Sequence, residues 1–396
     1  MHILFLYSSL IDPNKGGVQR VTFVLANYFK CYNINVSFLS FDSLNDSVKD
    51  SHDFSYFCLP NKQSIYNKEN REYLELLIKE QHIDIVINQG AINPEISKLS
   101  YIAKKLNVKL ISVIHNSIFS KIDNAEITYN YRFKNRGLSF VIPLLKLAST
   151  KFLLKKIYLK KYKNHYLKLY NENDRVILLS SQYFNEYHSF FEKKSNFDKL
   201  IAIPNPLSFT VTDSNNNKKK NLLYIGRLDF EQKRVDLLLQ IWSAIYKDFP
   251  DWILDIIGDG KVKEKIVSKI KTDNILRINV LGYQDPQTFY KKASILCLTS
   301  SYEGFGLVLV EAMAYGVVPV AFNSYASITD IINDKINGIL VNPFNVDEYI
   351  GKLKKLMTDE NVRKKLSKNA QLKAQQFSVD IVGQQWIKIF NQILSE

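Results

Sequence analysis

The sequence has few cysteines and no long apolar stretch. Its three cysteines, Cys31, Cys58 and Cys297, are scattered through 396 residues without the spacing of a metal site or a disulfide framework. Such cysteines are expected to pack as small hydrophobic side chains in a reducing compartment, which predicts a cytoplasmic protein. No apolar run approaches the roughly 18 residues that span a bilayer. The apolar run at residues 1–10 is too short for a signal peptide.

Apolar segments alternate with amphipathic ones along both halves of the chain. Because 396 residues exceed one typical domain and 46% of them are hydrophobic, two domains with full cores are expected. The alternation predicts parallel βα units and hence two doubly wound α/β domains. The polar stretch 208–220 is the best candidate for their boundary. Strands are expected at residues 2–8, 36–41, 84–88, 110–114, 221–226, 252–258, 278–282 and 295–300.

Two glutamates, Glu303 and Glu311, lie on either side of a glycine-containing turn that leads into the apolar run 307–314. A carboxylate in an apolar run needs hydrogen-bonding partners, or its pKa shifts until it is neutral. Hydroxyl groups of a bound sugar or ribose would supply such partners. The alternative is that Glu311 pairs with a lysine or an amide and that Glu303 is a solvated loop residue. Expected strands on both sides of the helix favour a ligand, because open α/β sheets bind ligands at the carboxyl ends of their strands.

Cations follow the expected strand at 221–226. Arg227 and Lys233 bracket a loop in which a diphosphate could rest, since Arg offers a planar fork of donors and Lys a compact charge. An ordinary charged loop is the alternative. The turn Gly258-Asp259-Gly260, after the next expected strand, could bring backbone close to a ligand, although such a turn is more often only a tight connection.

Together these motifs resemble a known family. The pair Gly226-Arg227 with Lys233, the Gly258-Asp259-Gly260 turn, and the spacing of Glu303 and Glu311 around Gly304-Phe305-Gly306 are similar to the retaining glycosyltransferase family 4 (glycosyl transferases group 1), which has the GT-B fold. The resemblance runs through nearly the whole chain and is densest at residues 221–342.

The resemblance implies two Rossmann-like domains that face a central cleft. An N-terminal, acceptor-binding domain would cover residues 1–207, and a C-terminal domain that binds the nucleotide sugar would cover residues 208–376. An amphipathic helix within residues 377–396 would cross back to the first domain. The basic segment 146–170 would form a helix in the first domain.

The resemblance also implies roles for individual residues. Arg227 and Lys233 would neutralise the donor diphosphate. Glu311 would hold the ribose hydroxyls and Glu303 those of the donor sugar. The residues implied for donor binding are Gly16, Gly17, Arg227, Lys233, Gly258, Tyr283, Glu303, Gly304, Phe305, Gly306, Leu307 and Glu311, and those implied for catalysis are His115, Glu303, Arg227 and Lys233. A hydrogen-bonded structural histidine is the alternative for His115.

Two features depart from the family pattern. Arg234 stands where the family often has a glycine after the lysine, so the turn there is expected to differ. The loop Asp229-Phe230-Glu231 lacks the proline that is common in the family. Neither departure removes a proposed contact with the donor.

The departing nucleoside diphosphate is an anion, so cations and helix-terminal amides would stabilise the transition state. Enzymes that use a metal ion for this purpose usually contain an Asp-x-Asp pair. The sequence has none, and its histidines are not clustered. Neither a metal ion nor another cofactor is therefore expected. The resemblance implies transfer with retention of configuration, usually explained by attack on the face that the leaving group vacates, and neither glutamate is assigned as a nucleophile.

The net charge of +14 has one concentrated source. The segment 146–170 contains eight lysines and no acidic residue, interleaved with aromatic and aliphatic side chains. A basic helix of this kind suits an anionic membrane surface. A solvated helix is the alternative, whereas nucleic acid is disfavoured because no nucleic-acid-binding motif is present. A membrane surface predicts a lipid-linked glycan acceptor at the inner face of a bacterial membrane.

Three functions are compatible with these features. The leading hypothesis is a glycosyltransferase that moves a hexose or N-acetylhexosamine from a nucleotide-diphosphate sugar, expected to be a UDP-sugar, to a glycan in O-antigen or capsule synthesis. A sugar-nucleotide epimerase of the same architecture would act on the donor alone. A non-catalytic module would only bind the sugar nucleotide or a glycan.

Overall fold

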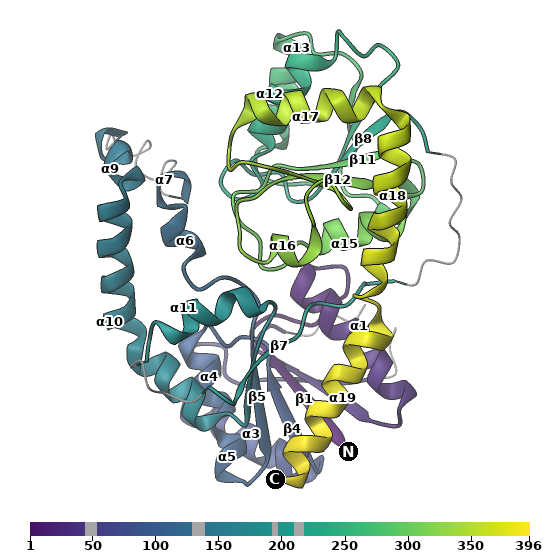
Figure 1. The fold of residues 1–396 in the computed structure, drawn as a ribbon. Helices are drawn as coiled ribbons and strands as arrows, with labels where there is room; N and C mark the ends of the chain where they lie inside the picture. Colours follow the sequence, from purple (N-terminus) through teal and green to yellow (C-terminus); the bar gives the residue numbers. More distant parts are fainter. Residues whose placement is uncertain (44–53, 129–138, 192–196, 210–217) are drawn as a thin grey trace. The chain divides into compact units, whose positions relative to one another are not determined.

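The computed structural model describes residues 1–43, 54–128, 139–191, 197–209 and 218–396 (Figure 1). The chain divides into two compact units. Unit 1 consists of Met1–Ile118, Lys155–Phe209 and Phe377–Glu396, and unit 2 of Phe119–Leu154 and Thr210–Gln376. The expected domains differ from this division in that residues 119–154 group with the second unit. Most of the polar stretch expected between the domains, residues 210–217, lies outside the described residues.

Unit 1 contains a seven-stranded sheet in the order β3-β2-β1-β4-β5-β6-β7, in which every pair is parallel. Central strands are continuous apolar runs because helices cover both faces of a parallel sheet. In β1, Phe5 lies opposite Phe38 of β2 and Ile87 of β4, and all three are buried. The strands are β1 (His2–Tyr7), β2 (Asn35–Ser40), β3 (Ser55–Cys58), β4 (Ile85–Asn88), β5 (Lys109–Ile114), β6 (Arg175–Leu178) and β7 (Leu200–Ala202).

The helices of unit 1 connect these strands and end with the last helix of the chain. They are α1 (Gly17–Cys31), α3 (Lys68–Glu80), α4 (Pro94–Ser100), α5 (Ile102–Lys105), η2 (Ser181–Tyr183), α11 (Phe184–His188) and α19 (Val379–Ser395). The long helix α10 (Ala148–Glu172) begins in the segment grouped with unit 2 and ends in unit 1.

The final helix, α19, packs against α1, as expected for a C-terminal helix that returns to the first domain (Figure 1). The rings of Phe29 and Phe390 meet edge to face with centroids 5.1 Å apart. A Cβ atom at Gly383 would lie 2.2 Å from the Tyr28 ring, so only glycine allows the two helices to approach this closely. The carboxylate of Glu396 also forms an ion pair with Arg175 at the start of β6, which holds the residue that follows α19 against the first sheet.

Unit 2 contains a second, six-stranded parallel sheet in the order β10-β9-β8-β11-β12-β13. The strands are β8 (Asn221–Ile225), β9 (Ile253–Ile257), β10 (Ile278–Val280), β11 (Ile295–Leu298), β12 (Val318–Phe322) and β13 (Ile339–Val341). The connecting helices are α12 (Val235–Ile245), α13 (Lys263–Thr272), α14 (Pro286–Tyr290), α15 (Leu307–Ala314), α16 (Ile328–Ile331), α17 (Val346–Thr358) and α18 (Glu360–Gln375). Short helices α6 (Ser120–Asp123), α7 (Ala125–Thr128), η1 (Ser139–Val141) and α9 (Ile142–Lys146) precede α10. The predicted class, two doubly wound Rossmann-like domains, is confirmed.

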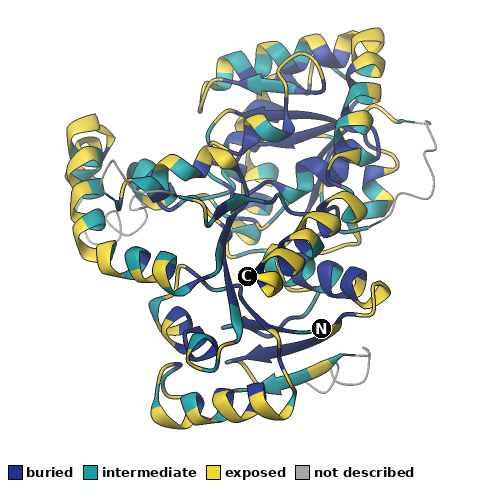
Figure 2. Cartoon of the chain, turned by 60° about the horizontal axis from the view of Figure 1, so that its bottom comes forward, coloured by how far each residue is buried: buried dark blue, intermediate teal, exposed yellow. Residues whose placement is uncertain are grey.

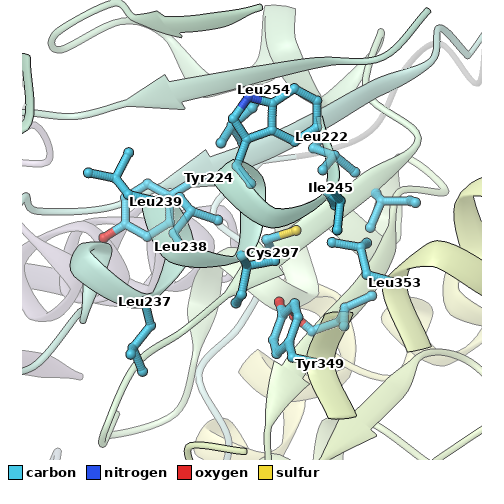
Figure 3. Packing of buried hydrophobic residues seen from close by; sticks show 14 of the residues in the cluster. Leu222, Tyr224, Leu237, Leu238, Leu239, Ile245, Leu254, Cys297, Tyr349 and Leu353 are labelled. Carbon is cyan, nitrogen blue, oxygen red and sulfur yellow. The ribbon is translucent and has the colours of Figure 1, made fainter. Parts of the chain in front are cut away.

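The central strands of both sheets form the buried centre of each unit (Figure 2). In unit 2, Tyr224, Cys297 and Tyr349 are fully buried in one hydrophobic cluster (Figure 3). The Tyr349 hydroxyl donates to the Val320 carbonyl oxygen at 2.7 Å, so this large polar side chain is satisfied inside the core. Burial raises the pKa of the Cys297 thiol to about 12 and keeps it neutral. The expectation that every cysteine packs inside is wrong for Cys31, which is exposed.

Candidate active site

The chain reverses its direction of travel across the second sheet between β8 and β11. From β8 the chain moves to its neighbour β9 on one side, and from β11 it moves to β12 on the other. The connections that leave these two adjacent strands diverge, and doubly wound folds bind ligands at the carboxyl edge of the sheet at such a point. The loop after β8 carries Arg227 and Lys233, and the loop after β11 carries Glu303.

Lys233 and Glu303 form an ion pair between these two loops. Lys233 Nζ lies 2.6 Å from Glu303 Oε1, and the two side chains are 15% and 10% exposed. The Ser300 hydroxyl donates to the same carboxylate oxygen at 2.6 Å. Glu303 is therefore not the solvated loop residue of the alternative interpretation. The low exposure makes the pair costly to break, because either charge alone would remain largely buried.

The carboxylate of Asp229 organises the loop that holds the two cations. Its Oδ1 accepts hydrogen bonds from the amides of Gln232 and Lys233 at 2.6 and 2.9 Å, and its Oδ2 accepts one from Arg227 Nε at 2.8 Å. Gln232 then accepts from Arg227 Nη2 and donates to the Tyr302 carbonyl oxygen in the loop after β11. Arg227 remains 63% exposed, so its guanidinium is oriented by the protein while it still faces solvent.

Arg234 ends this loop in a conformation that favours glycine. Its φ and ψ are 50° and 45°, in the left-handed region, immediately before α12. The turn therefore retains the backbone geometry suited to the glycine that the family often has there. The arginine side chain forms an ion pair with Asp236 at 2.9 Å, and its guanidinium lies 5.7 Å from the centre of the Phe344 ring. These contacts offset part of the cost of the left-handed conformation.

The Gly258-Asp259-Gly260 turn lets two backbone segments touch. A Cβ atom at Gly258 would lie 1.9 Å from the Gly226 carbonyl oxygen, and one at Gly260 would lie 2.3 Å from that of Leu228. The Leu228 amide donates to the Asp259 carbonyl oxygen at 2.9 Å, which fixes the loop after β8 against the loop after β9. The glycines therefore have a packing reason, and the predicted contact between Gly258 and a donor stays a prediction.

Glu311 lies inside α15 and is only 1% exposed. The hydroxyl of Tyr290, the last residue of α14, donates to Glu311 Oε2 at 2.8 Å. The Tyr290 ring stacks on Tyr315 with centroids 5.8 Å apart, and the Tyr315 hydroxyl donates to Gln287 Oε1. A tyrosine hydroxyl thus supports the buried carboxylate of Glu311, whereas the alternative interpretation had named a lysine or an amide as its partner. Tyr290 was not identified from the sequence.

The turn before α15 brings the predicted residues Gly304 to Leu307 to the same edge. Gly306 has φ 95°, and a Cβ atom there would meet the Tyr325 hydroxyl at 2.6 Å, so both conformation and space require glycine. α15 begins at Leu307, and Phe305 is 2% exposed. The positive end of the helix dipole therefore lies beside the Lys233–Glu303 pair, an arrangement that favours anions. Tyr283, in the loop after β10, is 63% exposed and presents an aromatic ring.

Three predicted site residues belong to unit 1. Gly16 has φ 118° and precedes α1, which begins at Gly17. No atom lies within 4 Å of a Cβ placed at Gly17, and the first turn of α1 contains no acidic residue. His115 follows β5 directly and is 9% exposed.

The imidazole of His115 is held by Gln89, a residue that the sequence analysis missed. His115 Nε2 lies 2.5 Å from Gln89 Oε1. Burial lowers the pKa of His115 to about 4, so the ring is neutral near pH 7. The following loop is held by Glu186 of α11, whose carboxylate accepts hydrogen bonds from the Ser117 hydroxyl and the Ile118 amide.

The described residues contain no group of three or more His, Cys, Asp or Glu side chains that could hold a metal ion. No helix among these described residues combines the length and the apolar character needed to cross a membrane.

The chain is similar in sequence to known glycosyltransferases. A Haemophilus influenzae protein that is named an uncharacterized glycosyltransferase is 30% identical over 203 residues, which are 50% of this chain and 57% of that protein. A Campylobacter jejuni enzyme, named as an α-1,4-N-acetyl-D-galactosaminyltransferase acting on a diNAcBac-PP-undecaprenol-linked glycan, is 29% identical over 206 residues, 52% of this chain and 57% of that enzyme. The chain thus spans a little over half the length of these relatives.

The fold has close counterparts among solved structures. The crystal structure of the pneumococcal O-GlcNAc transferase GtfA, in complex with UDP and GlcNAc, superposes with a TM-score of 0.73 at 15% identity and covers 100% of this chain and 99% of that one. Residues 211–373 match the family described as glycosyl transferases group 1, and this range contains Arg227, Lys233, Glu303 and Glu311. The family match therefore covers the segment in which the sequence motifs are densest, which agrees with the resemblance that those motifs show.

Proposed function

We propose that the protein is a retaining glycosyltransferase that moves a hexose or N-acetylhexosamine from a UDP-sugar to a lipid-linked glycan in bacterial surface polysaccharide synthesis. The observation that carries this proposal is the Lys233–Glu303 ion pair at the start of α15, at the switch point of the second sheet and within the segment that matches the group 1 glycosyltransferase family. The name of the Campylobacter relative supports a lipid-linked acceptor. The UDP and GlcNAc bound to GtfA support the donor class.

Charge stabilisation of the leaving UDP is the main task of this site. Lys233 supplies a compact positive charge, and the exposed Arg227 fork supplies paired N–H donors for a second phosphate oxygen. The amides at the start of α15 add a fixed positive potential. Asp229 already holds the Arg227 side chain and the Lys233 amide, and Glu303, itself fixed by Ser300, holds the Lys233 ammonium group. The two cations therefore need little reorganisation as charge develops.

The two glutamates would bind hydroxyl groups. Glu303 would contact the donor sugar while it keeps Lys233 in place, and Glu311, supported by Tyr290, would contact the ribose. In the proposed retaining reaction the acceptor oxygen bonds to the anomeric carbon on the face from which UDP departs. The proton of the acceptor hydroxyl passes to the departing phosphate oxygen. No carboxylate nucleophile, metal ion or other cofactor takes part in this scheme.

We propose that α10 carries a surface that binds the membrane in which the lipid-linked acceptor lies. Its first half exposes Phe152, Leu153 and Ile157, which are 61%, 56% and 55% exposed. The exposed lysines Lys156, Lys160 and Lys163 lie within this part of the helix or less than one turn beyond it. Apolar side chains that enter the interface and cations that meet anionic headgroups are the two contributions that bind a helix to a membrane surface. We therefore propose that the protein acts in the cytoplasm as a peripheral protein on the inner face of the membrane.

The donor is tested by the thermal stability of the purified protein with UDP, GDP, ADP and their sugars, with and without a chelator. A ligand at a hundred times its Kd adds about 2.7 kcal/mol to the free energy of unfolding, which is a readily measured rise in Tm. A rise with UDP and a UDP-sugar that the chelator leaves unchanged is expected. A rise in Tm with only GDP or ADP compounds would show that the donor is not a UDP-sugar. Loss of the rise when chelator is added would contradict metal-free binding.

The reaction type is tested by product analysis. A transferase releases UDP only when an acceptor is present, whereas an epimerase converts the donor without one. The expected product, formed from an undecaprenyl-diphosphate-linked glycan, keeps the anomeric configuration of the donor, which NMR coupling constants report. Inversion of configuration would refute the retaining mechanism, and donor conversion without acceptor would favour the epimerase.

A further inference from the structure

Gln89 and His115 form a buried pair at the carboxyl edge of the first sheet. Gln89 directly follows β4 and His115 directly follows β5, and these strands are neighbours in the sheet. Gln89 is 3% exposed and His115 is 9% exposed, and Gln89 Oε1 lies 2.5 Å from His115 Nε2. The pair therefore occupies an edge where doubly wound sheets bind ligands, and it is shielded from bulk water.

The contact determines which nitrogen of His115 carries the proton. Burial depresses the pKa of His115 to about 4, so near pH 7 the imidazole is neutral and has one N–H group. The Gln89 carbonyl oxygen can only accept, so the proton lies on Nε2. Nδ1 is then a hydrogen-bond acceptor. It is buried and has no hydrogen-bond partner within the described part of the chain.

Two hydrogen-bond donors close to His115 in the sequence are already used. The Ser117 hydroxyl and the Ile118 amide, which follow His115, both donate to the carboxylate of Glu186 at 2.8 and 2.6 Å. A buried acceptor without a partner costs free energy, and such a group in a native structure calls for an explanation. A donor group on a bound ligand would supply the missing hydrogen bond.

We propose that Gln89 is a positioning residue that holds His115 as the Nε2-protonated tautomer, so that Nδ1 accepts a hydrogen bond from a hydroxyl group of a bound sugar. An acceptor at Nδ1 suits a hydroxyl and repels a phosphate oxygen. His115 thus selects the sugar and does not neutralise the diphosphate. The identity of the ligand rests on the proposed function, whereas the tautomer does not.

The tautomer is tested by nitrogen-15 NMR of the full chain labelled on histidine, recorded at about pH 8, above the ordinary imidazole pKa. The chain has six histidines, and the spectrum of a His115→Asn variant assigns His115. The expected spectrum has a protonated Nε2 and an unprotonated Nδ1. A protonated Nδ1 in the wild-type protein would overturn the proposal.

Two variants separate positioning from packing. Gln89→Met fills the space without an acceptor and is expected to release His115 into a mixture of tautomers, whereas Gln89→Glu keeps an acceptor and the Nε2-protonated form. His165, whose Nε2 faces the Ala91 carbonyl oxygen at 3.0 Å, is an internal control that stays unchanged in both. Gln63→Met, at an exposed position of the same unit, is the matched control. An unchanged His115 tautomer in Gln89→Met would refute the role of Gln89.

The ligand is tested in the same spectra with UDP, UDP-glucose, UDP-galactose, UDP-GlcNAc and UDP-GalNAc. A sugar that raises the Tm beyond UDP alone is expected to move the Nδ1 resonance, which UDP leaves in place. For that sugar, Gln89→Met is expected to lower kcat/KM of transfer about three- to tenfold, and Gln89→Glu to restore most of it. A bound UDP-sugar that leaves Nδ1 unmoved would overturn the sugar contact. Failure of every UDP-sugar to bind would instead refute the proposed function and leave the tautomer result standing.

Discussion

Lys233 and Glu303 hold each other across the two loops that leave the centre of the second sheet, with Nζ 2.6 Å from Oε1. The pair joins the residue proposed to meet the diphosphate with the residue proposed to meet the sugar. Ser300 adds a second donor to the same oxygen, so the lysine and the glutamate are fixed before any substrate arrives. The proposed contacts with the diphosphate and with the sugar therefore depend on the same ion pair. Loss of either Lys233 or Glu303 is expected to disturb both contacts.

The first prediction concerns this pair. Lys233→Ala and Glu303→Gln are each expected to lower kcat about a hundredfold, because a preorganised charge at the leaving group is lost or displaced. Each is also expected to lower the free energy of unfolding by about 2 kcal/mol, since the remaining group is largely buried without its partner. Urea unfolding and steady-state kinetics measure the two effects.

The double variant shows whether the two residues act as a unit. Its loss of stability is expected to be smaller than the sum of the single losses, with a coupling of about 1 kcal/mol or more. Lys354, whose ion pair with Asp248 at 2.6 Å is exposed, is the control, and Lys354→Ala should change neither activity nor stability by more than about 0.5 kcal/mol. Strictly additive losses would contradict a functional Lys233–Glu303 unit.

The second prediction concerns the support of Glu311. Tyr290→Phe removes one hydroxyl and its 2.8 Å hydrogen bond, so the Glu311 carboxylate loses a partner that orients it. The affinity for UDP is expected to fall about tenfold, whereas that for 2′-deoxy-UDP should fall less, because the proposed role of Glu311 is to bind the ribose hydroxyls. Isothermal titration of both nucleotides measures this difference.

Tyr349→Phe is the matched control for Tyr290. It also deletes a buried hydroxyl bond, to the Val320 carbonyl oxygen at 2.7 Å, but in the hydrophobic core of the same unit. It should lower stability by about 1 kcal/mol and leave the ratio of the two nucleotide affinities unchanged. Equal losses for UDP and 2′-deoxy-UDP in Tyr290→Phe would show that Glu311 does not bind the ribose.

The overall fold could be predicted from the sequence because its strands are fully buried apolar runs at parallel-sheet spacing. Ile3, Leu4 and Phe5 of β1 have no exposed surface, so burial on both faces of the sheet is visible as an uninterrupted hydrophobic segment. Arg227, Lys233 and Glu303 could be predicted because each lies in a loop directly after such a strand. A polar residue in that position reaches the carboxyl edge regardless of the details of packing.

The supporting residues could not be predicted in this way. Tyr290 lies 21 residues from Glu311 and Gln89 lies 26 residues from His115, and neither pair belongs to a periodic pattern or a recognised motif. Only the packing of neighbouring elements brings these side chains together. The left-handed backbone of Arg234 could not be predicted either, because nothing in the sequence shows that an arginine adopts a conformation that favours glycine.

The third prediction compares two glycines of unit 2. Gly258→Ala places a methyl group 1.9 Å from the Gly226 carbonyl oxygen at φ 140°, so the loops after β8 and β9 must separate. The free energy of unfolding is expected to fall by about 3 kcal/mol or more. Gly351→Ala has no atom within 4 Å and lies within α17, so it should raise stability by about 0.5–1 kcal/mol. A Gly258→Ala protein as stable as the wild type would contradict the close approach.

The fourth prediction concerns pH. The pKa of His115 is lowered to about 4 by burial, below its ordinary value, so between these values the unfolded chain binds a proton that the folded protein does not. Stability from this group is therefore fully present at neutral pH and lost as the pH falls through the ordinary imidazole value toward 4. Between pH 7 and pH 5 the loss is expected to be about 2 kcal/mol.

The wild-type protein and His115→Gln are compared by urea unfolding at both pH values. The variant should lose about 2 kcal/mol less between pH 7 and pH 5, because glutamine does not titrate. His165, whose pKa is also lowered mainly by burial, contributes in the same direction and remains in both proteins. An identical pH dependence of the two proteins would show that His115 is not held neutral in the folded state.

The last prediction concerns the membrane surface proposed on α10. Replacing Lys156, Lys160 and Lys163 by glutamine is expected to weaken binding to vesicles of phosphatidylglycerol and phosphatidylcholine more than a hundredfold, since each lysine near an anionic surface contributes about 1 kcal/mol. Binding of the wild-type protein should fall as salt is added, because counterions screen the attraction. Sedimentation with vesicles measures both effects.

The matched control removes three exposed lysines elsewhere, Lys271, Lys365 and Lys368, so the net charge changes equally. If the protein bound only through its total charge of +14, both triple variants would lose the same affinity. A local surface on α10 requires a much larger loss for the first variant, with transfer to a short water-soluble acceptor unchanged in both. Binding that is absent in the wild type, or equal in the two variants, would refute the membrane surface while leaving the donor site untouched.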